Sequence, residues 1–148
     1  MDLSRIKHAL DTDKTQRAHV TAFGAGASTT PLCNLARCGV ERFTLSDPDR
    51  IEPVNIARQG HTEDQIGRFK VDAVAEMIRM INPRAEVTTL PRDCTGLSDP
   101  EIEEHFSGTD LFLFLTDRFS AQAWGNTLAL RFGTPVLWGG LYAGGLGW

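Results

Sequence analysis

The stretch from Asp47 to Gln59 carries the side chains best suited to chemistry. It follows a short apolar run and offers two carboxylates, an amide and a guanidinium, on Asp47, Asp49, Asn55 and Arg58. Carboxylates accept hydrogen bonds from ribose hydroxyls, and planar amide and guanidinium groups bind phosphate. The mixture therefore predicts a nucleotide site. Because Asp47 and Asp49 flank a proline, each is also compatible with a simple turn-forming role.

A glycine-rich turn precedes this stretch. Gly24, Gly26 and Ala27 come after the strand expected over 19–23 and before the helix expected over 28–38. Glycines let the backbone approach a ligand closely, and the free N–H groups of a helix N-terminus bind phosphate. The same pattern also serves in ordinary strand–helix turns, and Thr29 replaces the third glycine of GxGxxG.

Two further charged residues come later in the chain. Lys70 lies at the start of an expected helix, and a lysine there adds a point charge for phosphate. Asp117 follows the continuous apolar run 110–115. A carboxylate in that position suits Mg²⁺ held between protein and phosphate oxygens. It is equally suited to cap a helix that begins at Arg118, and both roles are compatible.

The elements that must position these residues alternate along the chain. Strands are expected over 19–23, 40–46, 86–90, 110–115 and 134–138, and helices over 2–14, 28–38, 68–81, 98–106 and 118–132. Such alternation predicts an α/β fold of Rossmann type, a mostly parallel sheet with helices on both faces. Ligands of these sheets bind at the carboxyl ends of the strands, where all the candidate residues lie.

Length and composition limit the alternatives. The 148 residues are enough for a single domain, and 41% hydrophobic and 23% charged residues are ordinary for a globular protein. A formal charge of −4 gives no reason to expect nucleic acid or an anionic membrane as a partner. The three cysteines have no CxxC spacing, which argues against a disulfide framework or a zinc site and favours packing roles in a cytoplasmic protein.

The order of the motifs resembles the family of ThiF, MoeB and the adenylation domains of ubiquitin-activating enzymes over roughly residues 17–147. The matching segments are Gly24-Ala25-Gly26, Asp47-Pro48-Asp49, Asn55-Ile56-Ala57-Arg58-Gln59, Gly67-Arg68-Phe69-Lys70, Asn82-Pro83 and Thr116-Asp117. Each segment alone is weak, but their combination in this order is specific.

The resemblance implies ATP-dependent adenylation of a carboxylate, usually the C-terminal Gly-Gly of a ubiquitin-like or sulfur-carrier protein. Asp49 would bind ribose, Asn55, Arg58 and Lys70 would contact phosphates, and Asp117 would bind Mg²⁺. The resemblance also implies a homodimer in the full-length protein, in which an arginine of the partner reaches the site. Arg5 is the nearest candidate, although surface charge is the more ordinary role for it.

The chain departs from the family pattern at four positions. Ala27 and Thr29 stand where the family usually has glycines, Arg118 where it usually has Asn, and Gln122 where it often has Arg. An arginine beside the phosphates could compensate or interfere. The chain also stops where the family continues into further strands, so we expect one ThiF-type nucleotide-binding domain, residues 1–148, from a longer protein. Alone, it should bind ATP–Mg²⁺ weakly and complete no adenylation.

Two other functions remain open from the sequence. A nicotinamide-dependent oxidoreductase would use the glycine turn and an acidic residue on ribose, but it would not explain Arg58, Lys70 and Asp117 together. A degenerate module that binds nucleotide or protein without catalysis is favoured slightly by the altered glycines.

Overall fold

The computed structural model describes residues 1–140. Five strands form one sheet in the order β3-β2-β1-β4-β5, and every neighbouring pair is parallel. The strands are β1 His19–Phe23, β2 Arg42–Ser46, β3 Glu86–Leu90, β4 Leu111–Phe114 and β5 Val136–Trp138. The α/β prediction is confirmed, and each expected strand is present with ends shifted by no more than two residues.

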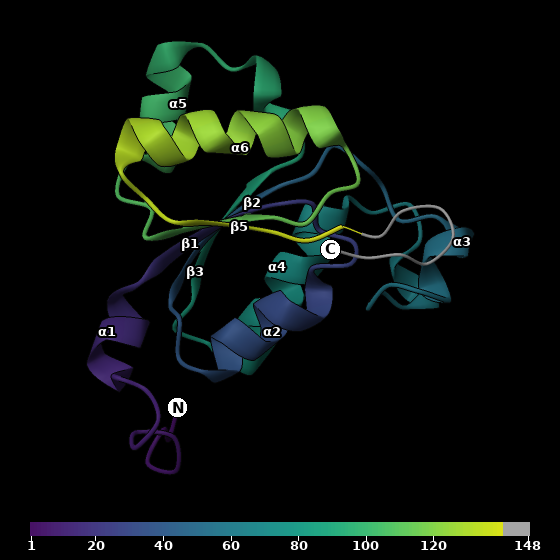
Figure 1. Ribbon diagram of the computed structural model, residues 1–148. Coiled ribbons are helices and arrows are strands. Elements are labelled where there is room, and N and C mark those ends of the chain that lie inside the picture. Colours follow the sequence, from purple (N-terminus) through teal and green to yellow (C-terminus); the bar gives the residue numbers. More distant parts are fainter. Residues whose placement is uncertain (141–148) are drawn as a thin grey trace.

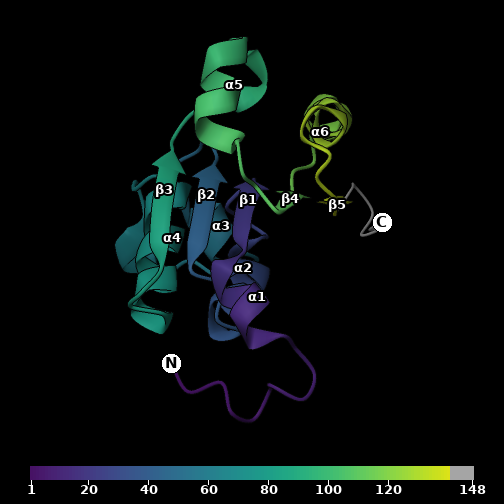
Figure 2. The same ribbon diagram turned by 90° about the vertical axis from the view of Figure 1, so that its left-hand side faces the viewer.

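The helices cover both faces of the sheet (Figures 1 and 2). Their bounds are α1 Thr12–Arg17, α2 Thr29–Arg37, α3 Pro53–Ile56, α4 Lys70–Ile81, α5 Asp99–Phe106 and α6 Phe119–Phe132, with single 3₁₀ turns at Glu63–Gln65 and Cys94–Gly96. On one face α2 and α4 bury Leu32, Val74 and Ile78 against β1 and β2. On the other, α5 and α6 bury Phe106 and Leu128 against the aromatic residues of β1 and β4.

The prediction of an N-terminal helix over 2–14 is wrong. Residues 4–9 form turns, and α1 begins only at Thr12, where the Asp11 carboxylate accepts a hydrogen bond from the Lys14 N–H at 3.0 Å. The apolar side chains of this segment do not pack on the sheet as a helix face would. Leu10 is 40% exposed, and α1 has no buried residue. Tertiary burial, more than propensity, stabilises a short helix.

The strand order places the switch point between β1 and β4, because β2 and β3 lie on one side of β1 and β4 and β5 on the other. The loops that leave the carboxyl ends of β1 and β4 therefore diverge there and leave a crevice, as in other doubly wound sheets. No helix among residues 1–140 combines the length and apolar character needed to cross a bilayer.

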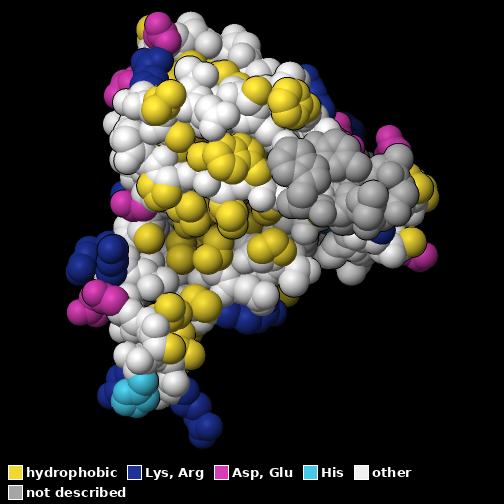
Figure 3. Space-filling model, viewed as in Figure 1, with side chains coloured by type: hydrophobic (Ala, Val, Ile, Leu, Met, Phe, Trp, Pro, Cys, Tyr) yellow, Lys and Arg dark blue, Asp and Glu magenta, His cyan; other side chains and the backbone are white. Residues whose placement is uncertain are grey.

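The described sheet ends at β5, and this edge is apolar. Figure 3 shows hydrophobic side chains gathered on the face that carries β5, below α6. Leu137 in β5 is 57% exposed and Leu130 in α6 is 85% exposed. Large apolar patches on soluble proteins often mark contact surfaces.

Candidate functional site

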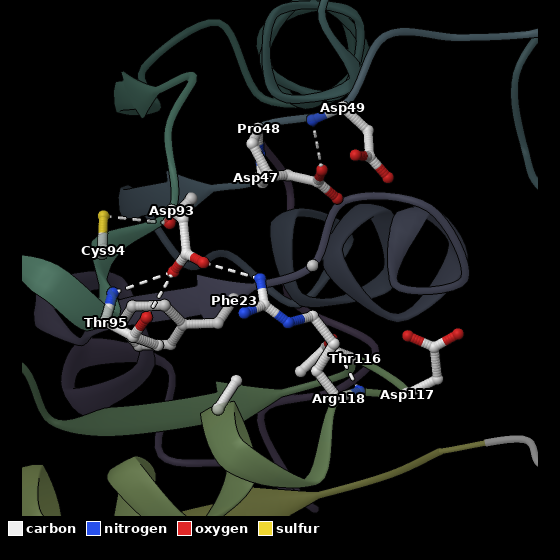
Figure 4. Close-up of a pocket in the computed structure, with 13 residues that line it drawn as sticks. Phe23, Asp47, Pro48, Asp49, Asp93, Cys94, Thr95, Thr116, Asp117 and Arg118 are labelled. Carbon is white, nitrogen blue, oxygen red and sulfur yellow. Dashed lines mark hydrogen bonds and ion pairs between the residues drawn. The ribbon is translucent and has the colours of Figure 1, made fainter.

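Two adjoining hollows lie at the carboxyl edge of the sheet, and they share Gly24, Asp47, Asp49, Thr116 and Asp117. The smaller, of about 140 Å³, is called the Asp93 chamber (Figure 4). Its other lining residues are Phe23, Ser46, Pro48, Asp93, Cys94, Thr95, Arg118 and Ala121. The larger, of about 460 Å³, is called the Lys70 chamber. Its other lining residues are Gly26, Ala27, Pro31, Arg58, Gln59, Lys70, Leu115, Gly139 and Gly140.

The glycine turn forms the wall between β1 and β4. Gly24 has φ +95°, and a Cβ there would lie 2.5 Å from the carbonyl oxygen of Leu115. A Cβ on Gly26 would lie 2.7 Å from the Gln59 carboxamide. Gly24 therefore requires glycine for its close approach to backbone, whereas a side chain at Gly26 would have to displace only the flexible end of Gln59. The predicted turn is present and faces the chambers.

Thr29 replaces the third glycine of the motif. Its side chain fits against the neighbouring loop because residue 60 is a glycine. The Thr29 hydroxyl donates to the Gly26 carbonyl at 2.8 Å. Its methyl carbon would lie 2.7 Å from a Cβ on Gly60. The absence of a side chain at Gly60 thus makes room for Thr29, and the departure from the glycine pattern is accommodated without opening the turn.

Asp47 braces the turn. It is 7% exposed, and its Oδ2 accepts from the Ala25 N–H at 2.7 Å while Oδ1 accepts from the Asp49 N–H at 2.8 Å. Burial raises the pKa of the Asp47 carboxyl above its ordinary value, against the opposing effect of these two hydrogen bonds and of Lys70. Both oxygens are engaged with backbone, so the turn-forming role considered for Asp47 is the one that the geometry supports.

Asp49 and Lys70 form an ion pair beside the turn. Lys70 Nζ lies 2.7 Å from Asp49 Oδ2, and the side chains are 9% and 63% exposed, respectively. The buried ammonium is held by α4, and the loop after β2 presents the carboxylate to both chambers. Asp49 is therefore the carboxylate of the pair that remains accessible to a ligand.

Asn55 and Arg58, three residues apart, have different placements. Asn55 is buried, and its Oδ1 accepts from the Glu52 N–H at 2.9 Å in a capping box at the start of α3. It lines neither chamber. Arg58 lies just past the end of α3, is exposed and lines the Lys70 chamber. The predicted phosphate contact through Asn55 is thus not supported by the geometry, whereas the one through Arg58 is.

Asp117, which follows β4, lines both chambers. It is not the N-cap of α6, the other role considered for it. The N-cap of α6 is Arg118, whose N–H is accepted by Thr116 Oγ1 at 3.2 Å. In Figure 4 the Asp117 carboxylate points away from Arg118. Residues 1–140 contain no group of three or more His, Cys, Asp or Glu side chains that could hold a metal ion. An ion at Asp117 would therefore need ligands from a bound phosphate and from water, as is common for Mg²⁺.

Some residues at the site were missed by sequence reasoning. Asp93, Thr95 and Cys94 lie in the loop after β3, and the position of that loop at a carboxyl strand end was the available signal. Cys94 is buried, in agreement with the packing role that the sequence predicts, and it also lines the Asp93 chamber. Burial raises the pKa of its thiol, which accepts from Ser46 Oγ at 3.0 Å.

A buried histidine lies behind the turn. His61 is 4% exposed, and neither ring nitrogen has a hydrogen-bond partner in the described part of the chain. Burial lowers the pKa of His61 and the Lys70 ammonium adds to that effect, whereas the Ala25 backbone and Asp47 oppose it. A neutral imidazole is the form suited to this place.

Comparison with known proteins identifies the family. The ThiF family profile matches residues 1–146. The chain belongs to the ThiF family. It is 32% identical over 126 residues to adenylyltransferase and sulfurtransferase uba4 of Aspergillus clavatus, covering 84% of this chain and 25% of that protein. It is 28% identical over 132 residues to the sulfur carrier protein adenylyltransferase of Thermus thermophilus, covering 88% of this chain and 48% of that protein. This ThiF domain thus spans between a quarter and a half of these curated relatives.

Solved structures of the same fold include E. coli MccB with ATP and E. coli TcdA, a tRNA N6-threonylcarbamoyladenosine dehydratase. The MccB complex superimposes with a TM-score of 0.76 at 24% identity, covering 88% of this chain and 38% of that one. TcdA gives a TM-score of 0.79 at 24% identity, covering 92% of this chain and 57% of that one. At this identity the likeness establishes the Rossmann-like fold of the ThiF domain.

Proposed function

We propose that this ThiF domain binds ATP–Mg²⁺ and belongs to an enzyme that adenylates a carboxylate, most simply the C-terminus of a ubiquitin-like or sulfur-carrier protein. One observation carries the proposal. The Lys70 chamber brings together the glycine turn, Asp49, Arg58, Lys70 and Asp117, which are separated along the sequence. The curated relatives are named adenylyltransferases, which supports the same reaction class.

The two chambers suit different parts of a nucleotide. Arg58 and Lys70, the latter paired with Asp49, place a guanidinium and an ammonium at the Lys70 chamber, together with the backbone of Gly26 and Ala27. Phosphates fit there, because guanidinium, ammonium and free N–H groups all favour anions. The Asp93 chamber lacks both cations and is walled by Phe23 and Ala121, which suits an aromatic base. Asp49 lines both, where the ribose would connect them.

In this proposal the protein assists the attack of a carboxylate on the α-phosphate without covalent catalysis. Arg58 and Lys70 stabilise charge that develops on the phosphates, and the glycine turn holds them in place. Mg²⁺, bound through Asp117 and phosphate oxygens, would supply further neutralisation of phosphate charge. Asp47 acts indirectly, because it fixes the turn and the loop that carries Asp49.

The proposal also covers the carboxylate that would receive AMP and the oligomeric state of the full-length protein. The MccB structures include complexes with MccA, and one relative is named a sulfur carrier protein adenylyltransferase. A protein or peptide C-terminus is therefore the acceptor class to test. The exposed apolar edge at β5 supports a homodimer or a further part of the full-length protein as its cover.

The test measures binding and chemistry separately. Titration calorimetry with ATP–Mg²⁺ and with NAD should show binding of ATP only, and pyrophosphate exchange in the native protein should depend on an added carrier protein. Preferential binding of NAD would revive the oxidoreductase alternative. Binding of ATP without exchange for any carboxyl-terminal Gly-Gly carrier would favour the non-catalytic module.

A further inference from the structure

Arg118 occupies a position where the ThiF pattern usually has asparagine, directly after Thr116-Asp117. The sequence left open whether its cation compensates or interferes beside the phosphates. In the structure it turns the other way, and its Nη1 lies 2.6 Å from Asp93 Oδ2 (Figure 4). Arg118 lines the Asp93 chamber and is absent from the lining of the Lys70 chamber.

Asp93 is itself held in place. Its Oδ1 accepts from the Thr95 N–H at 2.9 Å and from the Thr95 hydroxyl at 2.7 Å, so the carboxylate caps the 3₁₀ turn after β3. The remaining oxygen receives Arg118. The pair therefore connects the loop after β3 with the start of α6, two of the walls of the Asp93 chamber.

The pairing changes what the arginine can do. Since the charges of Arg118 and Asp93 cancel locally, the pair attracts phosphate less than a guanidinium without an acidic partner would. The Arg118 side chain is 55% exposed, and planar guanidinium groups can stack on aromatic rings while an acidic partner fixes their orientation. The same chamber has Phe23 and Ala121 in its lining and no other cation among the described residues.

We propose that Arg118, oriented by Asp93, stacks on the face of the nucleotide base and does not act on the phosphates. The inference rests on the proposed function, since it concerns the base of the same bound nucleotide. Arg118 is then a base-binding residue, and Asp93 is a positioning residue.

The experiment compares two ligands that differ only in the base. ATP–Mg²⁺ and ribose 5-triphosphate–Mg²⁺ are titrated by calorimetry into the wild type, Arg118→Asn and Asp93→Asn. Arg118→Asn should weaken ATP binding by roughly tenfold, the order expected for a cation–π contact, and leave ribose 5-triphosphate unchanged. Asp93→Asn should lower ATP affinity in the same direction by a smaller factor, again without effect on ribose 5-triphosphate.

Arg131→Asn is the matched control. Arg131 lies in the last turn of α6 and pairs with Asp99 at 2.6 Å, but it lines neither chamber. It should leave both affinities unchanged. Arg118 is 55% exposed, so its replacement should not prevent folding.

Three results would overturn the inference. Equal losses for both ligands would place Arg118 at the phosphates. Tighter ATP binding by Arg118→Asn would make the arginine an obstacle to the base, and unchanged ATP binding would make it an ordinary surface ion pair. Failure of the wild type to bind ATP would refute the proposed function instead, which separates the two hypotheses.

Discussion

Replacement of Gly24 by alanine tests whether the wall between β1 and β4 depends on a missing side chain. Gly24 has φ +95°, and the new Cβ would lie 2.5 Å from the Leu115 carbonyl oxygen. Gly67 provides the matched control, because it has φ +88° but no atom within 4 Å of the equivalent Cβ. Both variants add strain at positive φ, while only Gly24→Ala adds a clash with backbone.

The magnitude follows from these two terms. An alanine at positive φ costs about 1–2 kcal/mol at either site. Overpacking against backbone adds about 1–3 kcal/mol at Gly24 alone. The clash cannot be relieved cheaply, since Gly24 N–H donates to Ser46 O at 2.8 Å and Leu115 N–H donates to Phe23 O at 2.9 Å. We expect Gly24→Ala to lower the free energy of unfolding by about 4 kcal/mol and Gly67→Ala by about 1–2 kcal/mol.

Urea denaturation followed by circular dichroism measures both losses. A loss of about 4 kcal/mol corresponds to a decrease in Tm on the order of 10 °C for a chain of this size. Gly24→Ala should also weaken ATP binding, because Gly24 lines both chambers. Equal destabilisation by the two variants would show that the close approach to Leu115 contributes nothing, and the reasoning would be refuted.

Three further predictions concern charge. In the native protein, Asp117→Asn should leave the fold intact and abolish pyrophosphate exchange; exchange at the wild-type rate would remove Asp117 from the metal role. Arg58→Ala and Lys70→Ala should each cost about 3 kcal/mol in kcat/KM for ATP, non-additively, because both address the same phosphate charge; an unaltered kcat/KM would return that residue to a surface role. Burial lowers the pKa of His61 and of His19 below 6.5, so the unfolded state binds more protons below that pH. The contribution of these histidines to the free energy of unfolding should therefore be greatest above pH 6.5 and fall on acidification toward pH 5, and His61→Leu should flatten that fall in pH-dependent urea titrations; an unchanged slope would contradict the assignment.

The sequence determined the architecture because its signals are local. Apolar runs, Gly39 and Gly133 after helices, and the Ser98–Glu101 capping box each act within a few residues, and the resulting helices and strands are present. Alternation of strands and helices then implied a parallel sheet, and the carboxyl strand ends implied where the candidate residues meet. The prediction of a helix in the N-terminal segment was wrong because helical spacing of apolar residues does not show whether the fold offers a surface that would bury them.

The roles within the site were decided by contacts between distant parts of the chain. Asp47 and Asp49 both remained candidates for ribose or for a turn on the residues alone, but Asp47 accepts from the backbone of Ala25, 22 residues away, whereas Asp49 remains exposed to a ligand. The sequence left the effect of Arg118 beside the phosphates open, and in the structure it pairs with Asp93, 25 residues away. The local sequence does not tell which of several chemically suitable partners a carboxylate or a guanidinium group will meet. Only the three-dimensional arrangement of the loops at the sheet edge assigns each charge to backbone, to another side chain or to the open chambers.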